Sequence, residues 1–203
     1  MSSVSQTTEL TVDPSESPRL EPILEAALLL FLRFGFRKTS MQDVADAARI
    51  SRQGLYLHFP GKEQLFRAVA VHALSRGLDE ARTALAADGP LTERIPNAFD
   101  AWVGRFVGLG NTDASDLAEV GHALIGPDVA TFEKQFDAAV AACLESSEMR
   151  ELFERGQVTP QHVAAVLHAV ARGTKHSVSS REQFREQLVI ATRVLCVSSA
   201  GSC

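Results

Sequence analysis

The sequence predicts an all-α protein with a small N-terminal helical head and a larger helical body. Two observations support this fold class. From Pro18 onward, apolar residues recur at helical spacing, and clear strand patterns are hard to find. The chain has 203 residues, of which 45% are hydrophobic, enough for a sizeable core in one or two domains. We expect the head at residues 18–64 and the body at residues 65–203.

The first 17 residues are polar and hold three acidic side chains and no base, so we expect a disordered lead-in at residues 1–17. They lack the pattern of a secretion signal, and the densest apolar run, residues 26–32, is far shorter than the roughly 20 residues that span a bilayer. The three cysteines show neither zinc-ligand nor CxxC spacing. We therefore predict a cytoplasmic protein without membrane contact.

The first helix of the head should begin near residue 20. One face carries a helical series of apolar residues: Leu20, Ile23, Leu24, Ala27, Leu28 and Phe31. Gly35 is expected to end this helix.

Two short helices should follow within residues 40–59. Ser40 can cap the first, with Asp43 three residues later. Ser51 can cap the second, in which Leu55 and Phe59 stand four residues apart and so face the same core. The pair predicts a helix-turn-helix.

The outward face of the second short helix suits DNA. At 100° per residue, Gln53, Tyr56 and Leu57 lie opposite the core, with Arg52 and His58 on the flanks. Arginine can donate two hydrogen bonds to guanine, glutamine can pair both ways with adenine, and tyrosine or histidine can donate to phosphate oxygen. The alternative is an ordinary amphipathic helical hairpin with a solvated polar face.

Positive charge is concentrated in the predicted head, as expected for a segment that binds DNA. The formal net charge is −5, yet residues 18–62 carry +3 while residues 63–203 carry −5. The basic footprint covers Arg33, Arg37, Lys38, Arg49, Arg52 and Lys62. An acidic body would repel DNA and orient the head towards it. Chance clustering in a short segment is the alternative.

These motifs resemble the helix-turn-helix of the tetracycline-repressor (TetR) family, over about residues 20–74. The matching positions are Thr39-Ser40, Asp43-Val44-Ala45, Ile50-Ser51, Leu55-Tyr56, His58-Phe59, Lys62-Glu63 and Leu65-Phe66. The resemblance implies a three-helix DNA-binding head, a mostly helical body that forms a homodimer, and an effector pocket inside the body. DNA geometry also favours a dimer on a palindromic operator, because two such heads read half-sites about 34–36 Å apart.

Two positions depart from the family pattern. Arg49 stands in the turn where the family usually has glycine, at a position that often needs a positive φ. Gly54 stands where the family often carries a side chain on the reading face. DNA docking is therefore expected to differ at these two positions.

Each polar residue of the head can be given an expected role on DNA. We expect Arg52 and Gln53 to read bases. Phosphate contacts are expected from Ser40, Tyr56, His58 and Lys62, with Gln42 at the edge of the groove.

The body should hold a long helix at residues 62–87 and further helices at 91–107, 114–125, 127–146, 149–155, 160–175 and 180–197. The last two carry apolar stripes suited to a dimer interface: Val163, Val166, Leu167, Val170, Phe184, Leu188, Ala191 and Leu195. Plain core packing is the alternative for these stripes. Candidate effector-pocket residues are Phe99, Trp102, Phe106, His122, Phe132 and Phe136, although aromatic stripes are more often core than pocket.

Together, these patterns and what the family resemblance implies predict a ligand-responsive, sequence-specific DNA-binding transcriptional regulator. It would be a repressor that a small hydrophobic or aromatic effector releases from double-stranded DNA. No nucleotide-binding, zinc-protease or serine-hydrolase motif occurs, so we expect no enzyme, and we expect neither a metal nor a cofactor. His162, His168 and His176 do not stack on one helical face, which argues against a metal site. The alternative function is a helical protein-interaction adaptor without DNA binding.

Overall fold

The computed structural model describes residues 17–108, 114–147, 149, 153 and 158–196, and this part of the chain is helical throughout. The elements are α1 (Ser17–Lys38), α2 (Met41–Ala47), α3 (Arg52–His58), α4 (Lys62–Ala86), α5 (Leu91–Trp102), the 3-10 turn η1 (Gly104–Phe106), α6 (Ala114–Glu145), α8 (Pro160–Ser177) and α9 (Arg181–Cys196). The predicted all-α class is confirmed for these residues.

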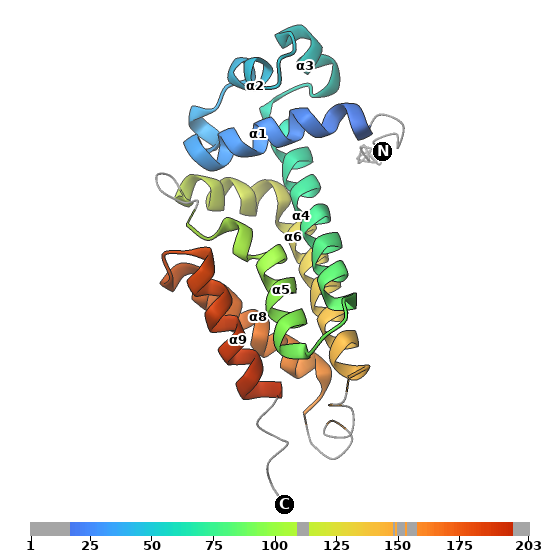
Figure 1. Cartoon of the computed structure of the whole chain (residues 1–203). Helices are drawn as coiled ribbons and strands as arrows, with labels where there is room; N and C mark the ends of the chain where they lie inside the picture. Colours follow the sequence, from blue (N-terminus) through green and yellow to red (C-terminus); the bar gives the residue numbers. More distant parts are fainter. Residues whose placement is uncertain (1–16, 109–113, 148, 150–152, 154–157, 197–203) are drawn as a thin grey trace, which may run out of the picture.

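The head consists of α1, α2, α3 and the first turns of α4, packed around one apolar cluster (Figure 1). Its centre is aromatic, because the Phe66 ring meets both Phe31 and Phe36 edge-on with ring centroids 5.2 Å apart. Val120 and Leu124 of α6 pack against the same cluster from below. The head is thus attached to the body by α6 as well as by α4.

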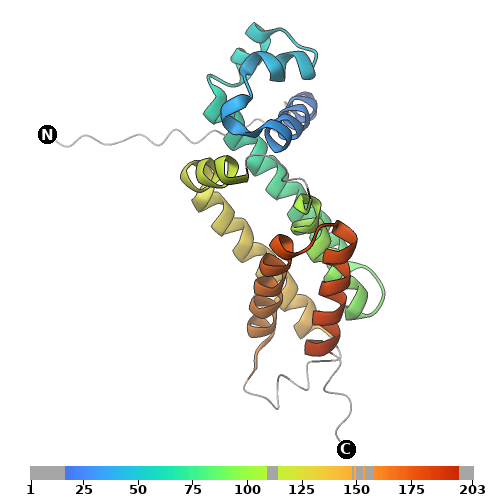
Figure 2. The same cartoon turned by 90° about the vertical axis from the view of Figure 1, so that its left-hand side faces the viewer.

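The body is a layered bundle of α4, α5, α6, α8 and α9 around a second apolar cluster. In Figure 1, α4 leaves the head and runs along most of the body, while Figure 2 shows α8 and α9 side by side at the end remote from α2 and α3. Cys143 and Cys196 are free and buried in this body, and burial together with the neighbouring Cys143 raises the pKa of Cys196 to about 11. Among the described residues, no helix has the length and apolar content needed to cross a membrane.

Gly35 breaks the regular helix of α1 as predicted, with a φ of 83°, and a short further helical stretch follows it as far as Lys38. Two predicted boundaries in the chain need correction. The helix predicted to reach residue 107 ends at Trp102 and continues as η1. The two helices predicted around Gly126-Pro127 form the single helix α6.

The continuity of α6 through Pro127 has a packing explanation. A proline inside a helix costs about 3 kcal/mol. Burial on both sides of the proline offsets this cost, with Ile125 before it and Phe136 and Val140 after it. The helix predicted at residues 149–155 lies mostly outside the described residues; of it, Met149 and Phe153 are described.

Candidate nucleic-acid interface

Helix α3 is seated on the head by two apolar side chains one turn apart. Leu55 is fully buried and Phe59 is 7% exposed. The Ser51 hydroxyl accepts a 2.9 Å hydrogen bond from the Gly54 N–H, so the helix begins where the sequence predicts. With its inner face held in this way, the orientation of the outer face of α3 is determined by the head itself.

The outer face of α3 keeps its polar groups free for a partner. Arg52, Gln53, Tyr56 and His58 are all exposed. The Arg52 guanidinium lies over the Tyr56 ring, 5.5 Å from its centroid, which aligns the two side chains next to each other. Within the described residues neither Arg49 nor Arg52 forms an ion pair, so both charges remain available to DNA.

Helix α2 begins with the predicted capping box. The Ser40 backbone N–H donates to the Asp43 carboxylate at 2.8 Å, and the Asp43 N–H donates to the Ser40 hydroxyl at 3.2 Å. The Ser40 hydroxyl itself donates to Asp43, and these bonds lower the pKa of the Asp43 carboxyl. Gln42 is exposed and donates to Asp46 at 2.8 Å. Both predicted contact residues of α2 therefore lie at the surface beside α3, already engaged in local bonds.

The turn between α2 and α3 has the backbone that its position in the motif demands. Arg49 has a φ of 57°, in the left-handed region that favours glycine. The Arg49 N–H donates to the backbone carbonyl of Asp46 at 3.2 Å, and the Ile50 N–H donates to the backbone carbonyl of Ala45 at 3.0 Å. The arginine thus replaces glycine at the cost of backbone strain, and in return it adds an exposed cation next to the reading helix.

Lys62 differs from its predicted role. Its ammonium group donates to three carbonyl oxygens near the end of α1, those of Phe36 at 2.9 Å, Thr39 at 3.0 Å and Arg37 at 3.3 Å. It also lies over the Phe36 ring, 4.5 Å from the centroid. An ammonium group has three N–H donors, and all three are occupied by these bonds. Lys62 therefore joins α4 to α1 instead of pointing to a phosphate.

Most of the candidate pocket residues pack against one another. Phe99 and Phe136 are fully buried with centroids 4.9 Å apart, and Trp102 stacks on Phe136 at 5.1 Å. Phe132 is partly buried beside this cluster, whereas His122 is exposed on α6. These contacts favour the core-packing alternative for the aromatic stripe.

Two polar residues beside aromatic rings of the body were not given a functional role from the sequence. His168 is buried, and its Nδ1 lies 2.6 Å from Asp137 while its ring meets Phe99 and Phe136 edge-on. It is thus a core histidine with a carboxylate partner. Lys175 lies over the Phe106 ring, 5.7 Å from the centroid, and burial lowers the pKa of its ammonium group. Helical spacing alone could not place either residue, because their partners come from distant segments.

The predicted dimer residues divide into two sets. Val163, Leu167, Phe184 and Leu188 are buried in the core of their own chain, as the packing alternative foresaw. Val166, Val170, Ala191 and Leu195 reach the surface wholly or in part. Exposed beside them on α9 are Ile190 and Val194. Their positions between the buried residues could be recognised only once the inner face of α9 was known.

Comparison with known proteins supports the interpretation of the head. Residues 23–69 match the family model described as bacterial regulatory proteins, tetR family. The chain is 43% identical over 60 residues to the uncharacterized HTH-type transcriptional regulator YfiR of Bacillus subtilis (strain 168), a match covering 30% of this chain and 29% of the relative. It is 41% identical over 46 residues to the protein of Escherichia coli (strain K12) named "Probable acrEF/envCD operon repressor", covering 23% of this chain and 21% of that protein.

The chain thus spans less than a third of the length of these curated relatives. The fold of the whole has a counterpart among solved structures. A transcriptional regulator of the TetR/AcrR family from Thermobifida fusca YX-ER1 superposes with a TM-score of 0.60 at 19% identity, covering 91% of this chain and 100% of the other. That family consists of regulatory proteins and not of enzymes. By its helix-turn-helix head the chain matches the tetR family of bacterial regulatory proteins over residues 23–69, and the helical body behind this head has the fold of the solved TetR/AcrR-family regulator.

Proposed function

We propose that this protein is a ligand-responsive, sequence-specific DNA-binding transcriptional regulator that represses by occupying a palindromic operator as a homodimer. The observation that carries this function is the outer face of α3. Its polar side chains are exposed and unpaired by acids, while Leu55 and Phe59 fix the helix from behind. In an amphipathic hairpin without a partner, the orientation of the solvated face would not need to be fixed in this way.

On the operator, Arg52 and Gln53 read base edges, and Tyr56 and His58 bind phosphates on either side of the groove. Ser40 and Gln42 contribute at the start of α2, where the helix N-terminus faces the backbone of the DNA. The local charge of +3 over residues 18–62 supplies attraction that the body, with −5, does not. Arg49 adds a phosphate contact that a glycine in the turn could not make.

Dimerisation in this proposal uses the outer faces of α8 and α9. Val166, Ile190 and Val194 are 47%, 53% and 60% exposed, a high value for three aliphatic side chains on adjacent helices. Val170, Ala191 and Leu195 extend the same faces. Two chains paired there in a four-helix arrangement present two copies of α3 to successive half-sites.

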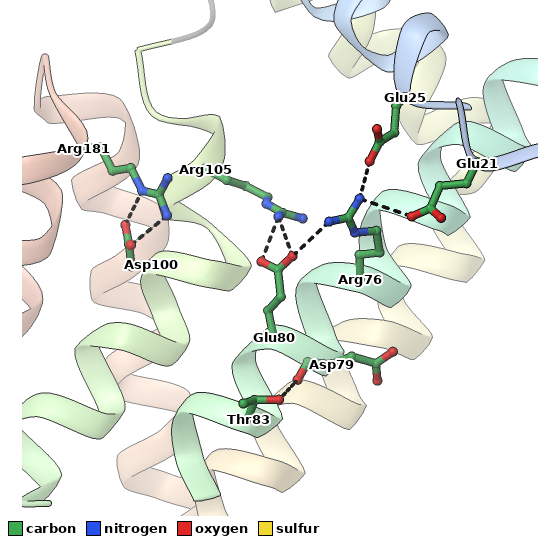
Figure 3. Close-up of polar contacts among 9 residues, drawn as sticks. All are labelled: Glu21, Glu25, Arg76, Asp79, Glu80, Thr83, Asp100, Arg105 and Arg181. Atoms are coloured by element: carbon green, nitrogen blue, oxygen red, sulfur yellow. Dashed lines mark hydrogen bonds and ion pairs between the residues drawn. The ribbon is translucent and has the colours of Figure 1, made fainter. Parts of the chain in front are cut away.

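Effector binding is proposed to act through α4 on the spacing of the two heads. A set of ion pairs ties the body to the head along this helix (Figure 3). Arg105 of η1 pairs with Glu80 of α4 at 2.8 Å, and Arg76, one turn before Glu80, pairs with Glu25 and Glu21 of α1. A small apolar effector that opens the aromatic core next to α5 and η1 would move α4 and, through these pairs, α1.

Repression, and not activation, is supported by one relative of the head, whose name describes it as an operon repressor. A coupling free energy of about 1–3 kcal/mol between effector and operator would lower DNA affinity roughly 5- to 150-fold. That range is sufficient to release a repressor whose operator is just saturated.

Selection of bound sequences from random duplex DNA tests the proposal. The full chain is expected to enrich an inverted repeat with half-sites about 34–36 Å apart. Its affinity for that repeat should fall steeply with salt, as counterion release requires. A chain that enriches no sequence and shows no salt-dependent binding is instead the helical adaptor of the alternative.

A further inference from the structure

Helix α3 carries an apolar side chain at the centre of its outer face. Leu57 is 81% exposed, the highest value among the large hydrophobic side chains of the described residues. At 100° per residue, Leu57 lies about 180° from the midpoint of Leu55 and Phe59, the two residues that seat α3 on the head. It therefore points straight away from the core, while Tyr56 and His58 lie to the sides, each about 80° from that midpoint.

The neighbours of Leu57 leave it unobstructed. Gly54, three residues earlier on the same side of the helix, has no side chain, and Gln53, four residues earlier, is exposed. Whatever approaches α3 head-on meets Leu57 first, with bare backbone on one side and a carboxamide on the other. Removing this leucine from water is favourable only against another apolar group, because polar edges in contact with it would lose hydrogen bonds to water.

The floor of the major groove offers one such group, the C5-methyl of thymine. We infer that Leu57 reads a thymine in each half-site, through contact between its own methyl groups and the C5-methyl. This inference rests on the proposed function, since it requires α3 to enter a major groove. Leu57 is then a specificity-determining residue that works without a hydrogen bond.

The position of the thymine relative to the other contacts follows from helix geometry. Four residues on a helix rise about 6 Å, against about 3.4 Å per base pair. The thymine contacted by Leu57 therefore lies within about two base pairs of the base contacted by Gln53. Each half-site should therefore contain an adenine, read by Gln53, and, within about two base pairs of it, a thymine, read by Leu57.

Replacing single thymines of the selected operator by deoxyuridine, which lacks only the C5-methyl, tests the inference. Fluorescence anisotropy at fixed salt would give the affinity of the full chain for each duplex. Replacing the contacted thymine in one half-site should weaken binding about fourfold, as expected for the loss of one buried methyl group. Replacing it in both half-sites should weaken binding about fifteenfold. Leu57→Ala should bind the unmodified operator more weakly and should no longer distinguish thymine from deoxyuridine at that position.

Leu29→Ala is the matched control, because Leu29 is also an exposed leucine of the head, 68% exposed, but lies on α1. It should keep the full thymine preference, and both variants should melt at the temperature of the unchanged protein. The salt slope should be the same for Leu57→Ala and for the unchanged protein, because no phosphate contact is removed.

Several outcomes would overturn the inference while leaving the proposed function intact. They are specific operator binding with no loss at any deoxyuridine, an operator half-site without thymine, and a Leu57→Ala variant that retains the thymine preference. A chain that selects no operator at all would instead remove the proposed function, and the inference with it.

Discussion

The head and the body use apolar side chains in opposite ways. In the head, Leu55 and Phe59 are buried, and the face of α3 opposite them is left open to solvent. In the body, the aromatic residues expected to line a pocket close on one another, with Trp102 and Phe136 stacked at an interplanar angle of 11°. The proposed function of the head can thus be traced on its exposed surface, whereas the effector response proposed for the body requires a core that opens.

The difference also concerns how far apart the interacting residues lie in the sequence. The N-caps and seating residues of the head operate over three or four positions. The body depends on contacts such as His168 with Asp137 and Arg181 with Asp100, across 31 and 81 positions. Experiments that change one region at a time can sharpen this contrast.

The largest effect is expected from opening the aromatic core. Phe136→Ala should lower the free energy of unfolding by about 3–5 kcal/mol, because Phe136 is fully buried against Phe99 and Trp102. Urea unfolding followed by Trp102 fluorescence would measure it, with the exposed Phe34→Ala as a control within about 0.5 kcal/mol of the unchanged protein. A decrease of less than 1 kcal/mol would show that the aromatic residues enclose a loosely packed cavity, and the body would then not differ from the head in this respect.

The next largest effect concerns the outer face of α9. Ile190→Glu combined with Val194→Glu should weaken self-association by about 2–4 kcal/mol, because both side chains are exposed in the single chain and central to the proposed interface. Sedimentation equilibrium would measure this, and Leu29→Glu on the head should leave association unchanged. Since neither residue is buried, the variant should keep its helical content. An unchanged protein that is monomeric at micromolar concentration would refute the interface.

A smaller effect is expected on the reading face. Arg52→Ala should cost about 1–3 kcal/mol in operator affinity and relax preference at one base pair, because a bidentate arginine contact is lost. Anisotropy titration against operator variants would show both changes. Arg82→Ala, which removes an exposed arginine of α4 in the body, is the control. An Arg52→Ala variant with the original affinity and site would mean that α3 docks by another face.

The smallest effect separates a structural lysine from a phosphate ligand. Lys62→Met should lower the free energy of unfolding by about 1–2 kcal/mol, since it leaves carbonyls at the end of α1 without their charged donor. The slope of operator affinity against salt should remain that of the unchanged protein. A slope flatter by about one would restore the phosphate contact first expected of Lys62.

Much of the head could be predicted from the sequence, because its signals are local. The caps at Ser40 and Ser51 and the seating pair Leu55 and Phe59 follow from neighbouring residues, and the positive φ at Arg49 follows from the resemblance of the turn to the family pattern. Lys62 could not be assigned in this way. Its partners lie 23–26 residues away, and only the packing of α1 on α4 brings them together.

The body was predictable as a set of helices but not as a set of surfaces. Pro127 marks a helix boundary in isolation, yet burial on both sides keeps α6 continuous. Leu188 and Ile190 stand two positions apart with similar side chains, and only the tertiary fold shows that the first is internal and the second external. The choice between core and interface depends on the angle at which α9 meets α5 and α8, which no local pattern specifies.

The ion pairs of Arg76 have a consequence for how operator binding must be measured. Arg76, Glu21 and Glu25 are each about half exposed, so added salt screens their attraction and weakens the hold of α4 on α1. Salt would then have two effects: it would weaken the contacts with DNA phosphates, and it would weaken the ion pairs that join α4 to α1. An affinity measured at a single salt concentration would combine the two, whereas the difference in slope between the unchanged protein and Arg76→Gln would count them separately.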